Sequence, residues 1–155
     1  MDDVIRRLYE AIKTRDTAAF ASLYHPEAEF SDPVFDLKGR QVPAMWHMLC
    51  EGGQDLAVSY RDVRAVGDSG SGHWEATYTF SPTGRKVRNR MDSEFRFRDG
   101  KILRQRDQFD FWRWSRQALG IPGLLLGWTP LLRAKVRKRA AANLAEFIAA
   151  HPRYR

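Results

Sequence analysis

Hydrophobic residues recur every three or four positions in three segments near the start of the chain. This spacing places the apolar side chains on one face of a helix and the polar side chains on the other. Gly52 and Gly53 follow the third segment, as glycines commonly do after the last turn of a helix. The pattern therefore predicts three helices, over residues 2–14, 18–23 and 39–50.

The period of the pattern then changes to two. Alternation of apolar and polar residues is typical of strands with one buried face. Segments rich in glycine and polar residues separate the strands, among them residues 68–72, which predict a turn. Helices followed by antiparallel strands give an α+β fold. After a short strand at 28–32, the predicted long strands cover residues 56–66, 73–80, 86–97 and 102–111.

Helical periodicity returns after the last strand. Asp110 can cap a helix over residues 112–119, because its carboxylate can accept from the first backbone amides. Thr129 followed by Pro130 is a strong helix start, since proline fits the first helical position. The helix that begins there is predicted to continue to about Ala150.

Composition and charge narrow the class of protein. Hydrophobic residues make up 43% of the 155 residues, and no apolar run is long enough to span a bilayer. The first residues, Met1-Asp2-Asp3, are acidic, whereas the start of a signal peptide is basic. The single cysteine, Cys50, can form no intrachain disulfide, so we expect a cytoplasmic protein. Residues 130–155 contain seven Lys or Arg and one Glu, which is +6 of the net +7. The rest of the chain is nearly neutral, which argues against nucleic-acid binding.

The dipeptide Asp32-Pro33 is the strongest candidate for chemistry. Proline fixes its own φ angle and favours an extended conformation for the residue before it. The carboxylate of Asp32 therefore has a fixed placement, which a base that removes a proton from carbon requires. Asp-Pro also commonly starts a turn, so the dipeptide alone does not establish a site.

The predicted strands place polar and aromatic residues on the same faces as apolar ones. A curved sheet with such faces, covered by helices, can enclose an apolar pocket with a few polar groups, which is the usual form of a small-molecule site. The same faces also suit an ordinary hydrophobic core, and periodicity does not separate the two. The residues that can be either core or pocket wall are Trp46 on a predicted helix and, on the strand faces, Trp74, Tyr78, Asn89, Ser93 and Phe109.

The order of elements and several motifs resemble the nuclear transport factor 2-like superfamily, which includes ketosteroid isomerases and SnoaL-type polyketide cyclases. The motifs are RLYEAI around Tyr9, FSDPVFDLKGRQVPAMW over residues 30–46, and FRFRDGKILRQRD over residues 95–107. The resemblance covers residues 2–111. It implies a cystatin-like cone, in which N-terminal helices pack on a curved antiparallel sheet. The shape of this cone favours a pocket, so the resemblance implies that the six residues named above line it.

The resemblance also implies roles for particular residues. Tyr9 is similar in position to an aromatic hydroxyl that stabilises the oxyanion in ketosteroid isomerases. Asp32 lies in an Asp-Pro-Val motif that resembles the one holding their catalytic base, and Asp107 is similar to the acid/base aspartate of SnoaL-like cyclases. Ser93 stands where ketosteroid isomerases have a second, protonated aspartate, while Asp92 points to the opposite strand face. This departure argues against steroid isomerisation.

Each candidate also has a structural explanation. Asp32 can accept hydrogen bonds within a turn, Tyr9 can be a core tyrosine, and Asp107 can pair with Arg104 or Arg106. Two classes of function therefore stay open. One is an isomerase, cyclase or hydrolase that uses aspartate acid/base catalysis, and the other is a non-catalytic module that binds a small ligand or a protein.

The resemblance implies a small hydrophobic ligand, no organic cofactor, and a homodimer formed through the exposed face of the sheet. Cys50 has no basic neighbours that would activate its thiol, so we expect it to be inert. The histidines follow no familiar metal-ligand spacing, so no metal site is expected. They are His25, His47, His73 and His151.

Residues 112–155 are expected to form a helical extension to the domain of residues 1–111. Residues 121–128 are too apolar for a solvated loop, and the helix after them has an apolar stripe. We therefore expect the extension to pack on the domain or across a dimer. A peripheral membrane contact is the alternative, because basic residues between 133 and 139 flank the stripe.

Overall fold

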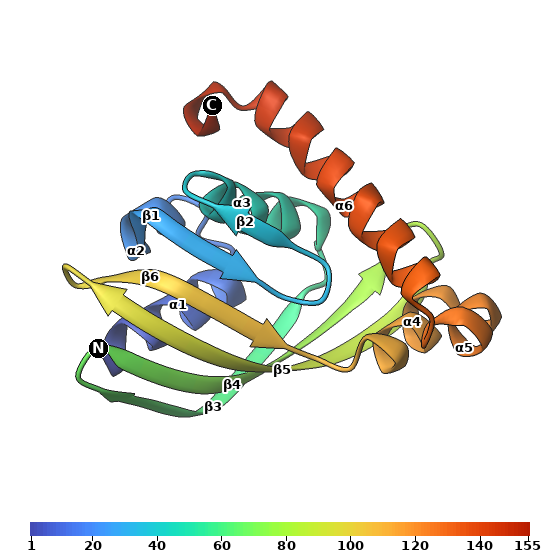
Figure 1. The fold of residues 1–155 in the computed structure, drawn as a ribbon, viewed down its shortest axis with the longest axis horizontal. Coiled ribbons are helices and arrows are strands. Elements are labelled where there is room, and N and C mark those ends of the chain that lie inside the picture. Colours follow the sequence, from blue (N-terminus) through green and yellow to red (C-terminus); the bar gives the residue numbers. More distant parts are fainter.

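The computed structural model describes all 155 residues as a curved sheet with helices on its inner face and a long helix at the C-terminus (Figure 1). Three N-terminal helices confirm the predicted ones: α1 (Asp2–Thr14), α2 (Phe20–Leu23) and α3 (Gln41–Gly52). Helix α1 lies against β3 and β4, while α3 lies against β1 and β2. None of the helices is both long enough and apolar enough to cross a bilayer.

Six strands form one sheet, in the order β2-β1-β6-β5-β4-β3. Most neighbours are antiparallel, as predicted, but β1 and β6 pair in parallel, with Phe30 opposite Gln105. This pairing joins the N-terminal part of the chain to the last strand and makes the sheet mixed. The strands are β1 (Tyr24–Ser31), β2 (Asp36–Lys38), β3 (Ala57–Val66), β4 (Ser69–Phe80), β5 (Arg85–Arg98) and β6 (Lys101–Gln108).

The prediction of a turn over residues 68–72 is wrong, because β4 already begins at Ser69. The glycines in this segment lie within the strand, where α1 approaches the backbone closely. A Cβ atom on Gly72 would lie 2.5 Å from the Tyr9 hydroxyl, and one on Gly70 would lie 2.7 Å from Ile5 Cδ1. These glycines are therefore required by helix packing and not by a turn.

The last strand is also shorter than predicted. It ends at Gln108, and α4 (Phe111–Leu119) begins where Asp110 accepts a hydrogen bond from the Arg113 amide at 3.1 Å. The cap prediction for Asp110 is thus confirmed, while the prediction of a strand over residues 109–111 is wrong. The cap carboxylate satisfies a backbone donor that has no partner within the helix.

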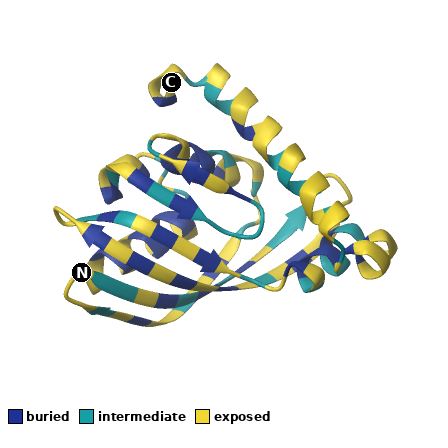
Figure 2. Ribbon diagram, viewed as in Figure 1, coloured by how far each residue is buried: buried dark blue, intermediate teal, exposed yellow.

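Two further helices complete the chain. The apolar segment after α4 forms the short helix α5 (Ile121–Leu126), and Thr129 caps α6 (Pro130–Ala150) before a final turn of 3₁₀ helix. Helix α6 passes over α3, and its Leu144 side chain is buried in the main core. Figure 2 shows α6 with a buried or half-buried side toward the domain and exposed residues on its outer side.

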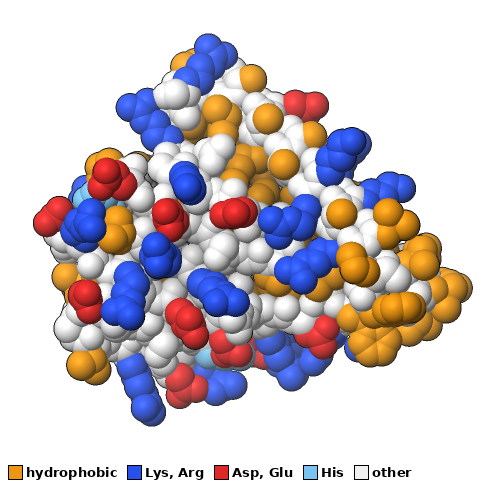
Figure 3. All heavy atoms as spheres, viewed as in Figure 1, with side chains coloured by type: hydrophobic (Ala, Val, Ile, Leu, Met, Phe, Trp, Pro, Cys, Tyr) orange, Lys and Arg blue, Asp and Glu red, His pale blue; other side chains and the backbone are white.

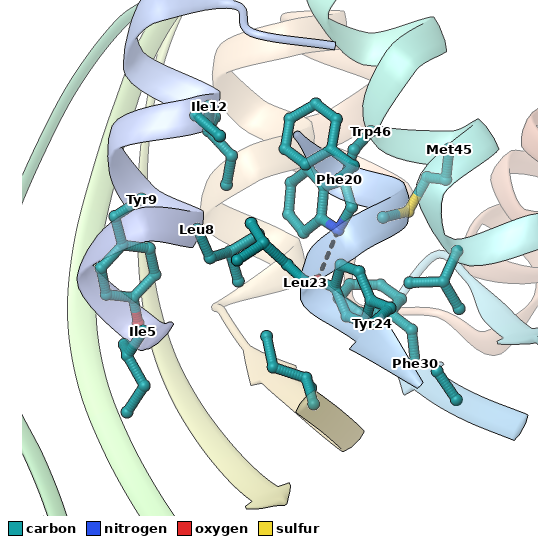
Figure 4. Close-up of a cluster of buried hydrophobic side chains, with 14 of the residues drawn as sticks. Ile5, Leu8, Tyr9, Ile12, Phe20, Leu23, Tyr24, Phe30, Met45 and Trp46 are labelled. Carbon is teal, nitrogen blue, oxygen red and sulfur yellow. Dashed lines mark hydrogen bonds between the residues drawn. The ribbon is translucent and has the colours of Figure 1, made fainter. Parts of the chain in front are cut away.

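The core lies between the helices and the sheet and is rich in aromatic rings (Figure 4). Trp46 of α3 packs against Phe30 at a ring-centroid distance of 5.6 Å and against Phe20 at 6.1 Å. Its indole Nε1 donates to the Tyr24 hydroxyl at 2.8 Å. This bond satisfies a buried polar group that would otherwise cost stability.

Candidate active site

Asp32 lies in the tight connection between β1 and β2. Its Oδ1 accepts hydrogen bonds from the amides of Val34 at 2.7 Å and Phe35 at 2.6 Å, and its own amide donates to the Phe35 carbonyl at 3.0 Å. The turn-capping role considered from the sequence is therefore present. Oδ1 accepts both amides, whereas Oδ2 accepts no hydrogen bond from the protein, so Oδ2 is available to hold a proton.

The surroundings of Asp32 change its acidity. Burial raises the pKa of this carboxyl from 3.8 to about 7, although the two backbone amides oppose that rise. The nearby Asp107 carboxyl raises the pKa further and Arg137 lowers it. With a pKa of about 7, Asp32 changes its protonation state near neutral pH, which suits a proton-transfer group.

Helix α6 contacts the turn that holds Asp32. The Arg133 Nε and one terminal nitrogen of Arg137 both donate to the Pro33 carbonyl at 3.2 Å. The carbonyl belongs to the residue directly after Asp32, so the C-terminal helix fixes the turn and places a positive charge near the carboxyl. Part of the extension thus contributes to the environment of the candidate base.

We expect Arg137→Met to raise the pKa of Asp32 above its present value. Methionine keeps most of the aliphatic stem but removes the charge that favours the ionised carboxylate. The measurement is a titration of the Asp32 side-chain carbon by NMR. Arg139→Met is the matched control, because Arg139 is exposed on the same helix. An Asp32 titration that does not change in Arg137→Met would contradict this electrostatic link.

Asp107 is the second buried carboxyl and lies on β6. The Trp74 Nε1 donates to its Oδ2 at 3.2 Å, and the Gln105 Nε2 donates to its Oδ1 at 3.0 Å. Burial raises its pKa to about 6, although the hydrogen bonds from Gln105 and Trp74 and the nearby Ser93 hydroxyl oppose the rise. The ion pair with Arg104 or Arg106 that the sequence left open is absent, because those two side chains are exposed on the other face of the strand.

A continuous hydrogen-bonded chain supports Asp107. The Tyr24 hydroxyl accepts from Trp46 and donates to Gln105 Oε1, and Gln105 in turn donates to Asp107. Tyr24 and Gln105 were not among the predicted site residues. The inward face of β6 placed Gln105 on the same side as Asp107, but only the parallel pairing of β1 with β6 brings Tyr24 beside it.

Tyr9 of α1 also lies near Asp107. Its side chain is fully buried, and its hydroxyl has no well-aligned hydrogen-bond partner. Gly72, Ser93 and Asp107 are cross-strand neighbours on β4, β5 and β6, and Tyr9 packs over this row. Burial raises the pKa of the Tyr9 hydroxyl, Ser93 lowers it, and Asp107 raises it further. The hydroxyl is therefore a neutral donor next to a carboxyl.

Ser93 and Asp92 lie on opposite faces of β5, as the strand alternation predicts. Ser93 is buried beside Tyr9 and Asp107, whereas Asp92 is exposed on the outer face, where His73 Nδ1 lies 2.8 Å from its Oδ1. No second carboxyl replaces Ser93 at this point of β5. The buried carboxyl of this part of the sheet is supplied instead by Asp107, directly opposite Ser93 on the next strand.

A family model described as the SnoaL-like domain matches residues 5–105. The chain belongs to the SnoaL-like domain family. The matched region includes α1, the Asp32 turn and most of the sheet. It ends before Asp107 and before the C-terminal helices. No curated protein matches the sequence.

Solved structures share the SnoaL-like fold. IdmH, a putative polyketide cyclase from Streptomyces antibioticus, is 24% identical, with a TM-score of 0.64 over 77% of this chain and 97% of its own. A hypothetical protein from Catenulispora acidiphila with a ketosteroid isomerase-like fold is 16% identical, with a TM-score of 0.66 over 82% of this chain and 97% of its own. An LEH-like epoxide hydrolase from M. tuberculosis is 17% identical, with a TM-score of 0.63 over 80% and 93%. At these identities the likeness shows the fold alone.

The predicted pocket residues of the SnoaL-like cone have different environments. Trp46 and Trp74 are buried, with ring centroids 5.8 Å apart, so they fill the space between α3 and the sheet. Tyr78 accepts a hydrogen bond from Trp114 at 2.8 Å, while Asn89 and Phe109 are half-buried. Two surface hollows of about 340 and 300 Å³ lie at the C-terminal helices and include none of these residues. An apolar cavity shared by Asp32 and Tyr9 stays a prediction.

The fold also brings His47 and His151 close together, although their spacing in the sequence did not predict a shared site. Ligand atoms of His47, Glu51 and His151 lie within 4.8 Å of one another, at the end of α6. The ring nitrogens of His47 are already used, because Nε2 lies 2.8 Å from Glu51 and Nδ1 lies 2.7 Å from Arg153. The positive charge of the Arg153 guanidinium disfavours binding of a metal cation here. The cluster of His47, Glu51 and His151 therefore holds the end of α6 against α3.

Proposed function

We propose that this protein binds a small hydrophobic molecule in its SnoaL-like cone and transfers a proton on it with Asp32. The observation that carries the proposal is the raised pKa of Asp32, about 7, on a rigid turn with one free carboxylate oxygen. An ordinary aspartate is fully ionised at neutral pH and is a weak base. A carboxyl whose pKa is near the working pH can both accept and return a proton.

The neighbouring groups have complementary roles in this proposal. Asp107 is held by Trp74 and Gln105 and makes the ionised form of Asp32 less favourable. Tyr9 has a buried hydroxyl without a well-aligned partner, as expected of a donor whose acceptor is supplied by a ligand. Tyr9 would then stabilise negative charge that develops on the oxygen of the substrate.

The chemistry suits a neutral carbonyl compound or an epoxide. Removal of a proton next to a carbonyl places charge on its oxygen, and opening of an epoxide needs both an acid and a base. Both reactions can be performed with carboxyl and hydroxyl groups of the protein. The names of the similar structures, a putative polyketide cyclase and an epoxide hydrolase, are compatible with this class of reaction.

We expect the protein to accelerate exchange of the α-protons of 2-tetralone, a hydrophobic bicyclic ketone, in deuterated water. Proton NMR measures the loss of the α-proton signal over time. Asp32→Asn keeps the size and the turn acceptor but removes basicity, so the protein-dependent rate should fall about 10²- to 10⁴-fold. Asp36→Asn is the matched control, since Asp36 is exposed four residues further along the chain.

A non-catalytic binding module is the second candidate, favoured by the filled space around Trp46 and Trp74 and by the turn-capping role of Asp32. The same experiment separates the two. Binding of 2-tetralone without accelerated exchange, or equal exchange rates for wild type and Asp32→Asn, would reject proton transfer by Asp32.

The proposal includes a homodimer that forms through the exposed outer face of the sheet. The outer face of the sheet is exposed and carries ion pairs between strands, including Arg90 with Glu75 at 2.9 Å and Arg104 with Glu29 at 3.2 Å. Such a face offers many polar groups to a second copy of the chain. Pairing through it would leave α6 and the turn that α6 contacts uncovered, because α6 lies on the helical side of the sheet (Figure 1).

A further inference from the structure

Helix α5 presents its apolar side chains to solvent. Figure 3 shows these hydrophobic side chains gathered at the end of the molecule where α4, α5 and the start of α6 meet. Isolated exposed apolar residues are common, but a contiguous group marks an interaction surface. We call this group the apolar tip; it consists of Ile121, Leu124, Leu125, Leu126, Trp128 and Leu131, exposed by 72, 47, 62, 50, 72 and 79%.

The orientation of α5 is fixed by glycines and not by its leucines. A Cβ atom on Gly123 would lie 1.9 Å from the Ser115 carbonyl oxygen, and one on Gly127 would lie 1.9 Å from the Ser115 hydroxyl oxygen. These glycines therefore let α5 pack directly on the backbone of α4. The glycine side of the helix faces the protein and the leucine side faces outward, which is the reverse of an ordinary surface helix.

Basic residues border the apolar tip, and acidic residues are missing from this part of the chain. Residues 111–145 contain seven Lys or Arg and no Asp or Glu. Arg85, Arg113 and Arg116 line a hollow of about 340 Å³ next to Gly120, and none of them forms an ion pair. Arg133 borders a second hollow of about 300 Å³, together with Trp112 and Trp128.

We propose that the apolar tip docks on a membrane surface that contains anionic lipids. The leucines and Trp128 would enter the boundary between headgroups and acyl chains, where tryptophan is favoured. The arginines of the larger hollow would bind lipid phosphates, because a guanidinium recognises phosphate oxygens in pairs. The contact is peripheral, and it is made by α5 and not by the apolar stripe of α6, which packs on the domain through Leu144.

A second copy of the chain suits this surface less well. Two-fold pairing through the same patch would bring the apolar tips together but would also set the unpaired arginines of one copy against those of the other. Like charges facing each other across an interface cost stability. An anionic lipid surface satisfies the apolar side chains and the arginines at the same time.

Flotation with vesicles of phosphatidylcholine and phosphatidylglycerol in equal parts tests the proposal on the full chain. We expect binding that weakens with added salt and is much weaker on pure phosphatidylcholine. Leu125→Glu should lower the vesicle affinity roughly a hundredfold, since a leucine side chain leaves the lipid and a negative charge is added. Arg113→Gln should lower it about fivefold, the usual effect of one cation near an anionic surface.

Matched controls exist on β3, far from α5. Val66→Glu changes another strongly exposed apolar residue, at 83% exposure, and Arg64→Gln removes another exposed cation. Neither should change vesicle binding. Lipids brominated in the acyl chain should quench tryptophan fluorescence, and Trp128→Phe should remove most of that quenching while the protein still binds.

Three outcomes would overturn the proposal. The first is equal binding of wild type and Leu125→Glu to the anionic vesicles, and the second is equal binding to anionic and neutral vesicles. The third is a dimer in light scattering that Leu125→Glu converts to a monomer, because the tip would then be an interface between copies. Circular dichroism of each variant shows whether the fold is kept, and exposed positions such as Leu125 are expected to tolerate the change.

Discussion

At about pH 8, Asp32→Asn is expected to be more stable than the wild-type protein, by up to about 4 kcal/mol. The physical reason is the cost of holding an ionised carboxyl in a partly apolar turn. Burial raises the pKa of Asp32 from 3.8 to about 7. A difference of roughly three pKa units corresponds to about 4 kcal/mol between the two protonation states. Asparagine is neutral and can still accept the Val34 and Phe35 amides through its Oδ1.

The sign of the pH dependence follows from proton binding. Between about pH 4 and 7 the folded protein binds more protons at Asp32 than the unfolded chain does, so stability falls as the pH rises through this range. Asp107, whose pKa is raised to about 6, acts in the same direction at a slightly lower pH. Below about pH 4 the carboxyls are protonated in both states, and wild type and Asp32→Asn should have similar stability.

Urea unfolding at several pH values measures this difference. The curve for Asp36→Asn should follow the wild-type curve, because Asp36 is exposed. Equal stability of wild type and Asp32→Asn at the higher pH would mean that Asp32 has an ordinary pKa, and the proposed proton transfer would lose its basis. A variant that gains stability and loses proton exchange would show that the charge at Asp32 is kept for function.

Gln105→Leu is expected to lower the free energy of unfolding by roughly 2 to 5 kcal/mol. Gln105 is fully buried, accepts from the Tyr24 hydroxyl and donates to Asp107. Leucine has a similar size but can replace neither bond. The Tyr24 donor and one Asp107 oxygen would each be left buried without a partner, and a buried polar group in that state costs about 1 to 3 kcal/mol.

The matched control is Gln108→Leu, at an exposed position on the same strand. It should change stability by less than about 0.5 kcal/mol. Urea unfolding at neutral pH compares the three proteins, with circular dichroism to confirm the fold. A Gln105→Leu variant as stable as wild type would show that the chain from Trp46 to Asp107 contributes nothing to the stability of the core.

Periodicity was sufficient to predict the elements whose packing follows from their own sequence. The first helix is predicted and observed over the same residues, and the long strand β5 differs from its prediction by one residue at each end. Periodicity did not predict strand β2 or the parallel pairing of β1, because both depend on partners elsewhere in the chain. Strand β2 has three residues, too few to show a period, and the parallel partner of β1 lies far along the chain.

Helix α5 was missed for a different reason. Its sequence, Ile-Pro-Gly-Leu-Leu-Leu, contains two residues that usually interrupt helices. The helix forms because Pro122 lies in its first turn, where no hydrogen bond is lost, and because Gly123 allows contact with α4. Neither condition is visible without the neighbouring backbone.

The candidate site was predicted in part. Motifs on the sequence indicated Asp32, Tyr9 and Asp107, and the structure places Asp107 close enough to influence the other two. The contacts that tune them come from elsewhere. Arg137 reaches the Asp32 turn from the last helix, and Tyr24 supports Asp107 through Gln105. Such contacts join distant segments, so no local pattern could reveal them.

The parallel pairing of β1 with β6 has a consequence for synthesis of the chain. Tyr24 pairs with Ile102, so β1 has no partner on that side until three intervening long strands have been made. At about 5 to 20 residues per second, this interval lasts roughly 4 to 16 s. During that time the apolar side chains of β1 and its open edge are exposed to other nascent chains. Slow translation of β3 to β5 therefore lengthens the period in which this protein is prone to aggregate.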